Sequence, residues 1–297
     1  MILLLGKNGQ VGWELQRSLA PLAPLVALDR HGTGGLCGDF NDPQGLAATV
    51  RAVRPAVIVN AAAYTAVDKA ESEPELAARI NAAAPDALAR EAAACGALLV
   101  HYSTDYVFDG SGDAPWSEDS AVGPLNVYGR TKLAGEEAIR RCGCAHLILR
   151  TSWVHGAHGG NFARTMLRLG QERARLTVID DQWGAPTAAD LIADVTAHAI
   201  RQLRQRPQDG GTYHLAAGGA THWFGYAQYL FDLLRQARPA IALKVSEVAP
   251  IPTSAYPTPA ARPHNSRLDT RKLQTVFGLH LPPWQDGVSR LVAEMLR

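Results

Sequence analysis

The chain has 297 residues, of which 47% are hydrophobic and 19% charged, values typical of a globular protein that buries a sizeable interior. Its formal net charge is +1, from 29 basic and 28 acidic residues, which argues against nonspecific attraction to nucleic acid or to an anionic membrane. We therefore expect neither of these partners, and any anion-binding site should be local.

Short apolar runs alternate with alanine-rich helical stretches through the first half of the chain. This pattern predicts an α/β fold of the doubly wound type, with a parallel sheet covered by helices on both faces. The opening run is too short for a signal peptide or a membrane span and predicts a buried strand. The expected strands are residues 2–5, 25–28, 57–59, 98–101 and 146–149. The expected helices are residues 12–19, 45–53, 75–95 and 127–141.

The sequence becomes less regular after Arg150, where glycine- and proline-rich segments such as 156–160 and 250–263 interrupt the helical pattern. Irregular connections of this kind are typical of a binding region built partly of loops. We expect one domain over residues 1–150 and a smaller, lid-like domain over residues 151–297. Some segments of the second domain should return to the sheet of the first.

The four cysteines are Cys37, Cys95, Cys142 and Cys144. They are too sparse for a secreted disulfide scaffold, and a single Cys-x-Cys pair does not make a zinc site. Because glutathione and thioredoxin keep cytosolic thiols reduced, free thiols and a cytoplasmic location are the expectation.

Three glycines, Gly6, Gly9 and Gly12, follow the first expected strand and open the first expected helix. A tight strand-to-helix turn needs glycine for its backbone angles, for close approach of a pyrophosphate and for packing of the helix on the sheet. The amino end of the helix also supplies N–H donors to an anion. The turn therefore predicts a dinucleotide site, although three glycines also occur in ordinary loops.

Asp29 ends the second expected strand, close to the position where an acidic side chain binds the hydroxyls of an adenine ribose. Its charge would repel a 2′-phosphate and favour NADH, whereas Arg30 and Lys7 would hold that phosphate in NADPH. The sequence leaves this choice open. It also leaves open that Asp29 and Arg30 are only a solvated strand end.

Tyr128 and Lys132 are four residues apart and share one face of an expected helix. A phenol has a pKa near 10, and a nearby ammonium group lowers this pKa toward the range in which the phenol is a useful acid. Thr104, at the carboxyl end of the fourth expected strand, would bond the substrate oxygen that receives the proton. Together with the glycine turn, these residues indicate a nicotinamide-dependent reductase.

Longer blocks of sequence carry a family resemblance. They are residues 6–15, 59–68, 103–108, 124–129, 150–153, 181–187 and 262–268. Through these blocks the chain resembles the extended short-chain dehydrogenases, and within them the dTDP-4-dehydrorhamnose reductases. The resemblance implies an NAD(P)-binding Rossmann domain followed by a substrate-binding domain. It also implies hydride transfer from NADPH to C4 of dTDP-4-dehydro-L-rhamnose, which gives dTDP-L-rhamnose for cell-surface polysaccharide.

The resemblance further implies roles for single residues. Those expected to be catalytic are Thr104, Tyr128 and Lys132. Those expected to bind the cofactor are Gly6, Gly9, Gln10, Val11, Gly12, Asp29, Arg30, Asp39, Phe40, Ala62, Ala63, Tyr64, Thr65, Tyr128 and Lys132. Those expected to bind the substrate are Thr104, Asp105, Trp153 and Arg262, with Arg267 as a second candidate for its diphosphate. A core role for Trp153 and a surface role for both arginines are the alternatives.

Members of this family are also described as homodimers linked to magnesium. The acidic ligands would correspond here to Glu14, Asp190 and Glu294. Asp190 is shorter than the glutamate that the resemblance leads us to expect. Magnesium prefers oxygen ligands and retains water, so such a site would be loose.

Three other functions stay open at this point. A nucleotide-sugar dehydratase would need an Asp-Glu couple directly after the threonine, whereas Thr104 and Asp105 are followed by Tyr106. An epimerase would need an acid-base pair near Thr104, for which His101 and Cys95 are candidates. A regulatory subunit, such as a regulator of methionine adenosyltransferase that resembles this reductase, would keep the fold without turnover.

Overall fold

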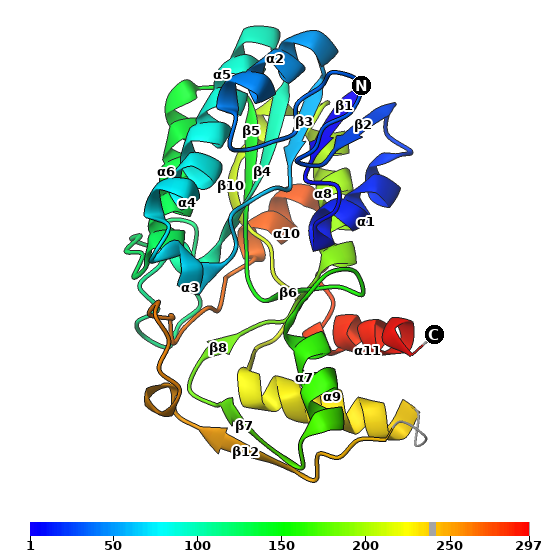
Figure 1. The fold of residues 1–297 in the computed structure, drawn as a ribbon. Coiled ribbons are helices and arrows are strands. Elements are labelled where there is room, and N and C mark those ends of the chain that lie inside the picture. The colour runs from blue at the N-terminus through cyan, green and yellow to red at the C-terminus, as the bar shows by residue number, and fades with distance from the viewer. Residues whose placement is uncertain (238–241, 297) are drawn as a thin grey trace.

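The computed structural model describes residues 1–237 and 242–296. At its centre is a six-stranded parallel sheet in the order β10-β5-β4-β3-β1-β2, which confirms the expected fold class (Figure 1). The strands are β1 (Ile2–Leu5), β2 (Leu25–Leu28), β3 (Val57–Asn60), β4 (Leu98–Thr104), β5 (His146–Thr151) and β10 (Gly211–His214). The fourth and fifth strands run further than expected, to Thr104 and Thr151.

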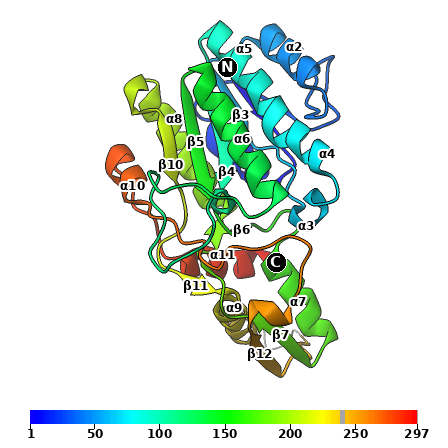
Figure 2. The same ribbon diagram turned by 90° about the vertical axis from the view of Figure 1, so that its left-hand side faces the viewer.

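Helices cover both faces of this sheet (Figures 1 and 2). One face packs against α1 (Gln10–Leu19), α8 (Ala189–Leu203) and α10 (Arg271–Phe277), and the other against α2 (Pro43–Val53), α5 (Ala84–Cys95) and α6 (Val127–Cys142). Successive side chains of β1 enter the two hydrophobic cores in turn, with Leu4 in one and Leu3 and Leu5 in the other. Because both faces are buried, such a strand is apolar throughout rather than alternating.

The helix expected over residues 75–95 is interrupted. It begins as α4 (Pro74–Ala78), passes through a π-helical turn at Arg79–Ala83 and continues as α5. Gly135 of α6 packs so closely on this turn that a Cβ atom there would lie 2.2 Å from the Asn81 carbonyl oxygen. Turns of this kind occur frequently at functional sites, and this one adjoins the cavity described below.

A smaller region lies at one end of the sheet, below it in Figure 1. Its helices are α7 (Phe162–Glu172), α9 (Trp223–Ala237) and α11 (Trp284–Met295), which enclose a third hydrophobic core. Its paired strands are β6 (Val154–His155) with β9 (Thr187–Ala188), β7 (Arg175–Ile179) with β12 (Glu247–Ile251), and β8 (Trp183–Gly184) with β11 (Thr221–His222). The remaining short helices are α3 (Val67–Ala70) and 3₁₀ turns at Asp105–Val107, Pro207–Asp209 and Thr253–Ala255.

Three elements from the second half of the sequence pack with the central sheet. β10 pairs with β5 at the edge of the sheet, α8 packs beside α1, and α10 packs against α8 and β10. Segments of the second half therefore do return to the first sheet. The domain boundary at residue 150 stays a prediction.

Candidate active site

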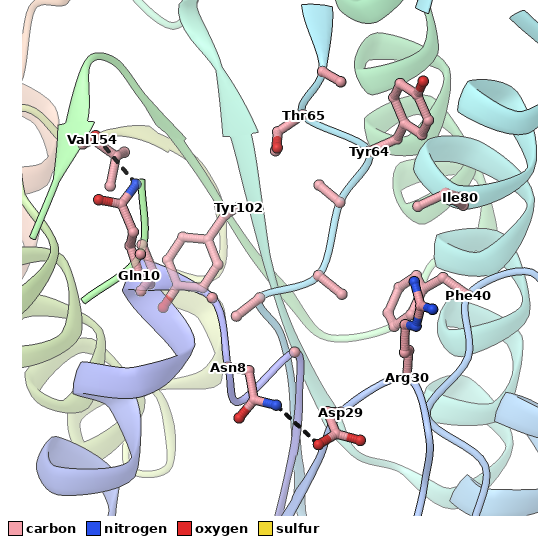
Figure 3. A pocket seen from close by; sticks show the side chains of 18 of the residues that line it. Asn8, Gln10, Asp29, Arg30, Phe40, Tyr64, Thr65, Ile80, Tyr102 and Val154 are labelled. Carbon is pink, nitrogen blue, oxygen red and sulfur yellow. Dashed lines mark hydrogen bonds between the residues drawn. The ribbon is translucent and has the colours of Figure 1, made fainter. Parts of the chain in front are cut away.

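A cavity of about 770 Å³ lies at the carboxyl ends of the central strands, which is where doubly wound sheets bind ligands. Of the residues expected to bind the cofactor, all except Gly12 line it. Figure 3 looks into the cavity, with Gln10 and Val154 on one wall and Tyr64 and Thr65 on the other. The structure thus gathers residues from five separate segments around one space.

The glycine turn forms part of the cavity lining. Gly6 has a φ of +88°, and a Cβ atom there would lie 2.7 Å from the backbone nitrogen of Ala62. A Cβ atom at Gly12 would lie 2.0 Å from the Gly6 carbonyl oxygen, so Gly12 packs under the turn and does not line the cavity. Gly9 caps α1 and leaves space for a ligand, since a Cβ atom there would meet nothing closer than 3.5 Å. The amino end of α1 therefore suits a phosphate.

Asp29 and Arg30 line another part of the cavity, where Arg30 lies beside Phe40 (Figure 3). The Asp29 carboxylate accepts hydrogen bonds from the His31 backbone at 2.9 Å and from Asn8 Nδ2 at 3.0 Å. The His31 hydrogen bond, helped by Lys7 at 3.8 Å and by Asn8, holds the pKa of Asp29 below its usual range. Asp29 is therefore ionised at neutral pH, and its charge is partly offset by Lys7.

Asn81 is a site residue that sequence reasoning missed. Its side chain accepts a hydrogen bond from the Tyr64 backbone N–H at 2.9 Å and donates to the Tyr64 carbonyl and to the Thr131 hydroxyl, each at 3.1 Å. It thereby ties the cavity wall at Tyr64 to α6. The only signal in the sequence was a polar residue within an alanine-rich helix, which by itself indicates nothing.

Tyr128 and Lys132 both line the cavity from the first turns of α6. The helix begins there because Asn126 caps it, accepting a hydrogen bond from the Gly129 N–H at 2.8 Å. A Cβ atom at Gly129 would lie 2.2 Å from the Tyr106 carbonyl oxygen, so glycine lets the helix approach the end of β4. The predicted tyrosine and lysine therefore meet the glycine turn in one cavity.

The expectation that Lys132 lowers the pKa of Tyr128 is wrong for this structure. Burial raises the pKa of Tyr128 to about 12, against a lowering by the Thr104 hydroxyl and with a further rise from Asp105. The physical reason is that removing the phenol from water disfavours its charged form, and this effect outweighs the lowering by Thr104. Lys132 Nζ donates to the Tyr102 carbonyl at 2.6 Å. Burial also lowers the pKa of Lys132 itself, to about 8.

Thr104 is the last residue of β4, and Asp105 begins the 3₁₀ turn that follows. Both lie beside Tyr128 but do not line the cavity. Both are buried, and the Thr104 hydroxyl donates to Asp105 Oδ1 at 3.0 Å while accepting from the Tyr106 backbone at 3.2 Å. Burial raises the pKa of Asp105 to about 6, although hydrogen bonds from Ser266 and Thr104 oppose the rise. Among the described residues, Asp105 Oδ2 has no hydrogen-bond partner.

Trp153 does not line the cavity, and its backbone adopts a φ of +49°, which is uncommon for a bulky residue. Its ring stacks on Trp223 with centroids 3.6 Å apart. Gly184 permits this position, because a Cβ atom there would lie 2.7 Å from the Trp153 ring. The indole therefore packs against the third hydrophobic core.

We expected Arg262 to bind the diphosphate of the substrate, but in the structure its side chain is already paired. Its guanidinium forms a bidentate ion pair with Asp68, with both nitrogen–oxygen distances at 2.7 Å. This pairing lowers the pKa of Asp68. Arg267 lies over the Trp183 ring at 5.8 Å and is likewise engaged.

The acidic residues expected to hold magnesium, Glu14, Asp190 and Glu294, do line one small cavity. Arg290 lies there with them, its Nε 3.0 Å from Asp190 and 3.1 Å from Glu294. In residues 1–237 and 242–296, no three metal-binding side chains come close enough to hold an ion. The arrangement does not fit magnesium, because the Arg290 guanidinium already occupies the space between two of the three carboxylates and pairs with both.

The chain resembles known proteins over its whole length. A family model described as RmlD substrate binding domain matches residues 1–297. A dTDP-4-dehydrorhamnose reductase of Salmonella typhimurium is 60% identical over 294 residues, covering 99% of this chain and 97% of that protein.

Solved structures show the same relation. The dTDP-4-dehydrorhamnose reductase from Clostridium acetobutylicum has a TM-score of 0.88 at 32% identity, covering 100% of this chain and 99% of that one. The enzyme from Bacillus anthracis, solved in complex with NADP, has a TM-score of 0.87 at 34% identity, covering 99% and 98%. The chain therefore belongs to the RmlD family of dTDP-4-dehydrorhamnose reductases.

Proposed function

We propose that this protein reduces the C4 keto group of dTDP-4-dehydro-L-rhamnose with NADPH and releases dTDP-L-rhamnose, a precursor of cell-surface polysaccharide. One observation carries the proposal: in a member of this family, the glycine turn, Tyr128 and Lys132 line a single cavity. NADPH is favoured because the Bacillus anthracis relative is in complex with NADP and because Lys7 offsets the Asp29 charge. NADH is the alternative cofactor.

NADPH, when bound, supplies the hydride that reaches C4. We assign the proton to Tyr128, whose raised pKa keeps the phenol protonated until a substrate oxygen is beside it. Thr104 is assigned to orient that oxygen together with Tyr128, and Lys132 to bind the ribose next to the nicotinamide. Stabilising the developing negative charge on oxygen is the electrostatic task of this group.

The remaining site assignments are also proposals. The residues that line the cavity would hold the cofactor, while Asp105 and Trp153 would approach the sugar nucleotide. Arg262 could bind a diphosphate only by exchanging its Asp68 partner. No step is assigned to magnesium, since Arg290 already pairs with two of the carboxylates expected to bind it.

The test follows the absorbance of NADPH in the presence and absence of the dTDP-keto sugar. We expect oxidation only with the sugar, and dTDP-L-rhamnose as the product identified by NMR. Binding of NADP without any turnover would instead indicate a regulatory subunit. The same assay with NADH decides the cofactor.

Assembly and location are further parts of the proposal. A homodimer rests on the family resemblance, and light scattering with and without EDTA tests both the dimer and a metal dependence. Within the part of the chain that the structure describes, no helix is both long and apolar enough to cross a bilayer. A cytoplasmic location stays a prediction from the sparse cysteines.

A further inference from the structure

Three buried side chains form a hydrogen-bonded row behind the cavity wall: Asn60, His101 and Lys132. Asn60 ends β3 and lies directly opposite His101 of β4 in the parallel register. Asn60 and His101 are each 1% exposed and Lys132 is 2% exposed. The imidazole lies between the other two, with Nδ1 2.9 Å from Asn60 Nδ2 and Nε2 3.3 Å from Lys132 Nζ.

The backbone determines the direction of the first hydrogen bond. The N–H of Ala62 can only donate, and it donates to Asn60 Oδ1 at 3.0 Å. The other end of the amide, Nδ2, therefore faces His101 and donates to Nδ1. A neutral imidazole with an accepting Nδ1 carries its proton on Nε2. The ring is neutral, because burial holds the pKa of His101 well below its usual value.

This tautomer presents a donor to Lys132. An ammonium group has only donors, so Nε2–H and an ammonium cannot bond to each other. The amine form of Lys132 can accept from Nε2–H and still donate to the Tyr102 carbonyl, 2.6 Å away. The row of hydrogen bonds is therefore complete only when Lys132 is an amine.

The charges that face Lys132 do not reverse this conclusion. Glu136, one turn further along α6, favours the ammonium form. However, Glu136 is bound by Arg150 through two hydrogen bonds of 2.7 and 2.9 Å and by Arg140 at 2.9 Å. Tyr128, one turn earlier, holds its proton because its pKa is raised to about 12.

We propose that His101, oriented by Asn60, is a positioning residue that stabilises the amine form of Lys132. Lys132 then exchanges a proton in the working pH range rather than remaining a permanent cation. In the proposed reaction, Tyr128 gives its proton to the substrate oxygen. The ammonium form of Lys132, which lines the same cavity, then returns a proton to the phenolate through water. The resulting amine accepts the His101 Nε2–H bond until it takes up a proton from solvent. This last role rests on the proposed function, whereas the tautomer does not.

The first test is ¹⁵N NMR of the ligand-free protein with labelled histidine. The spectrum has 10 histidines, and loss of a signal in His101→Phe assigns His101. We expect Nε2 to carry the proton and Nδ1 to carry none. A proton on Nδ1 overturns the proposal, whatever the enzyme assay shows, so failure here is distinct from failure of the proposed function.

In the second test, the substitution Asn60→Asp reverses the direction of the hydrogen bonds in the row. The carboxylate still accepts from Ala62, but its second oxygen can only accept, so His101 must move its proton to Nδ1 and accept from Lys132. We expect the pKa of Lys132, measured by NMR of labelled lysine, to rise by about one unit or more. Glu136→Gln is the matched control and should lower that pKa.

A through-space charge effect would also raise the pKa of Lys132 in Asn60→Asp. The double variant Asn60→Asp with His101→Phe separates the two causes, because coupling through the imidazole disappears with the ring. A rise that persists in the double variant overturns the proposal. If Asn60→Asp does not fold, the tautomer of the wild-type protein decides alone. If Asn60→Asp raises the pKa of Lys132 through His101, the alkaline limb of the pH–rate profile of this variant should move to higher pH by the same amount.

Discussion

The cofactor side and the substrate side of this site are built in different ways. Most of the cofactor side consists of short contiguous segments that leave the ends of neighbouring parallel strands, so the sheet register brings these segments together. The substrate candidates Trp153 and Arg262 depend on partners distant in sequence, such as Asp68, 194 positions from Arg262. Backbone register therefore positions one side, and side-chain pairing positions the other.

The largest expected effect is a loss of turnover with the cofactor side of the site left intact. Tyr128→Phe removes the proposed acid and should lower kcat by about 10²- to 10⁴-fold, the usual contribution of a positioned proton donor. NADPH affinity, measured by fluorescence titration, should stay close to that of the wild type. Near wild-type turnover would contradict the assignment of Tyr128.

The cofactor side can be tested at its backbone. Gly6→Ala should weaken NADPH binding and cost more than the roughly 1–3 kcal/mol of a strained backbone, because the new Cβ also meets the Ala61 and Ala62 backbone. Gly143→Ala is the matched control, since Gly143 has a φ of +72° but open space around it. Denaturant unfolding and NADPH titration measure both. Equal effects of the two substitutions would argue against close approach as the role of Gly6.

The raised pKa of Asp105 predicts that the stability of the protein depends on pH. Its folded-state pKa of about 6 lies above the ordinary value of 3.8, so its contribution is fully present below about pH 4 and is lost as pH rises through 6. Two pKa units correspond to about 2–3 kcal/mol. Asp105→Asn, which resembles the protonated acid, should gain stability relative to wild type by this amount between pH 4 and pH 7. Urea unfolding measures the free energy of unfolding of both proteins at each pH. A difference between the variant and the wild type that stays constant from pH 4 to pH 7 would contradict the raised pKa.

The smallest expected effect concerns the substrate side. Arg262→Lys keeps the charge but loses the bidentate geometry with Asp68. Because Asp68 is partly exposed, we expect a loss of only about 0.5–1 kcal/mol in unfolding free energy. Asp68→Asn in the Arg262→Lys background should then add little. Full additivity of the two substitutions would show that the pair contributes nothing in solution.

Several features of the site were beyond sequence reasoning for identifiable reasons. The π-helical turn at residues 79–83 has no sequence pattern of its own, and it packs against Gly135 of a helix distant in the sequence. The pKa of Tyr128 depends on burial and on the neighbouring Thr104 and Asp105 side chains, and a four-residue spacing contains neither. The alignment of Asn60 with His101 required the register between two strands.

The sequence by itself determined the parallel α/β fold, the glycine turn and the placing of Tyr128 and Lys132 on one helix face. These are local properties, since strand burial, glycine φ angles and helical spacing act over a few residues. Only the tertiary structure decided which charges are already paired, as Arg262 is with Asp68 and Arg290 with Asp190. It also decided that Lys132 bonds the Tyr102 carbonyl rather than the phenol. Pairing and desolvation depend on distant segments, which hydrophobic and polar patterns along the chain do not specify.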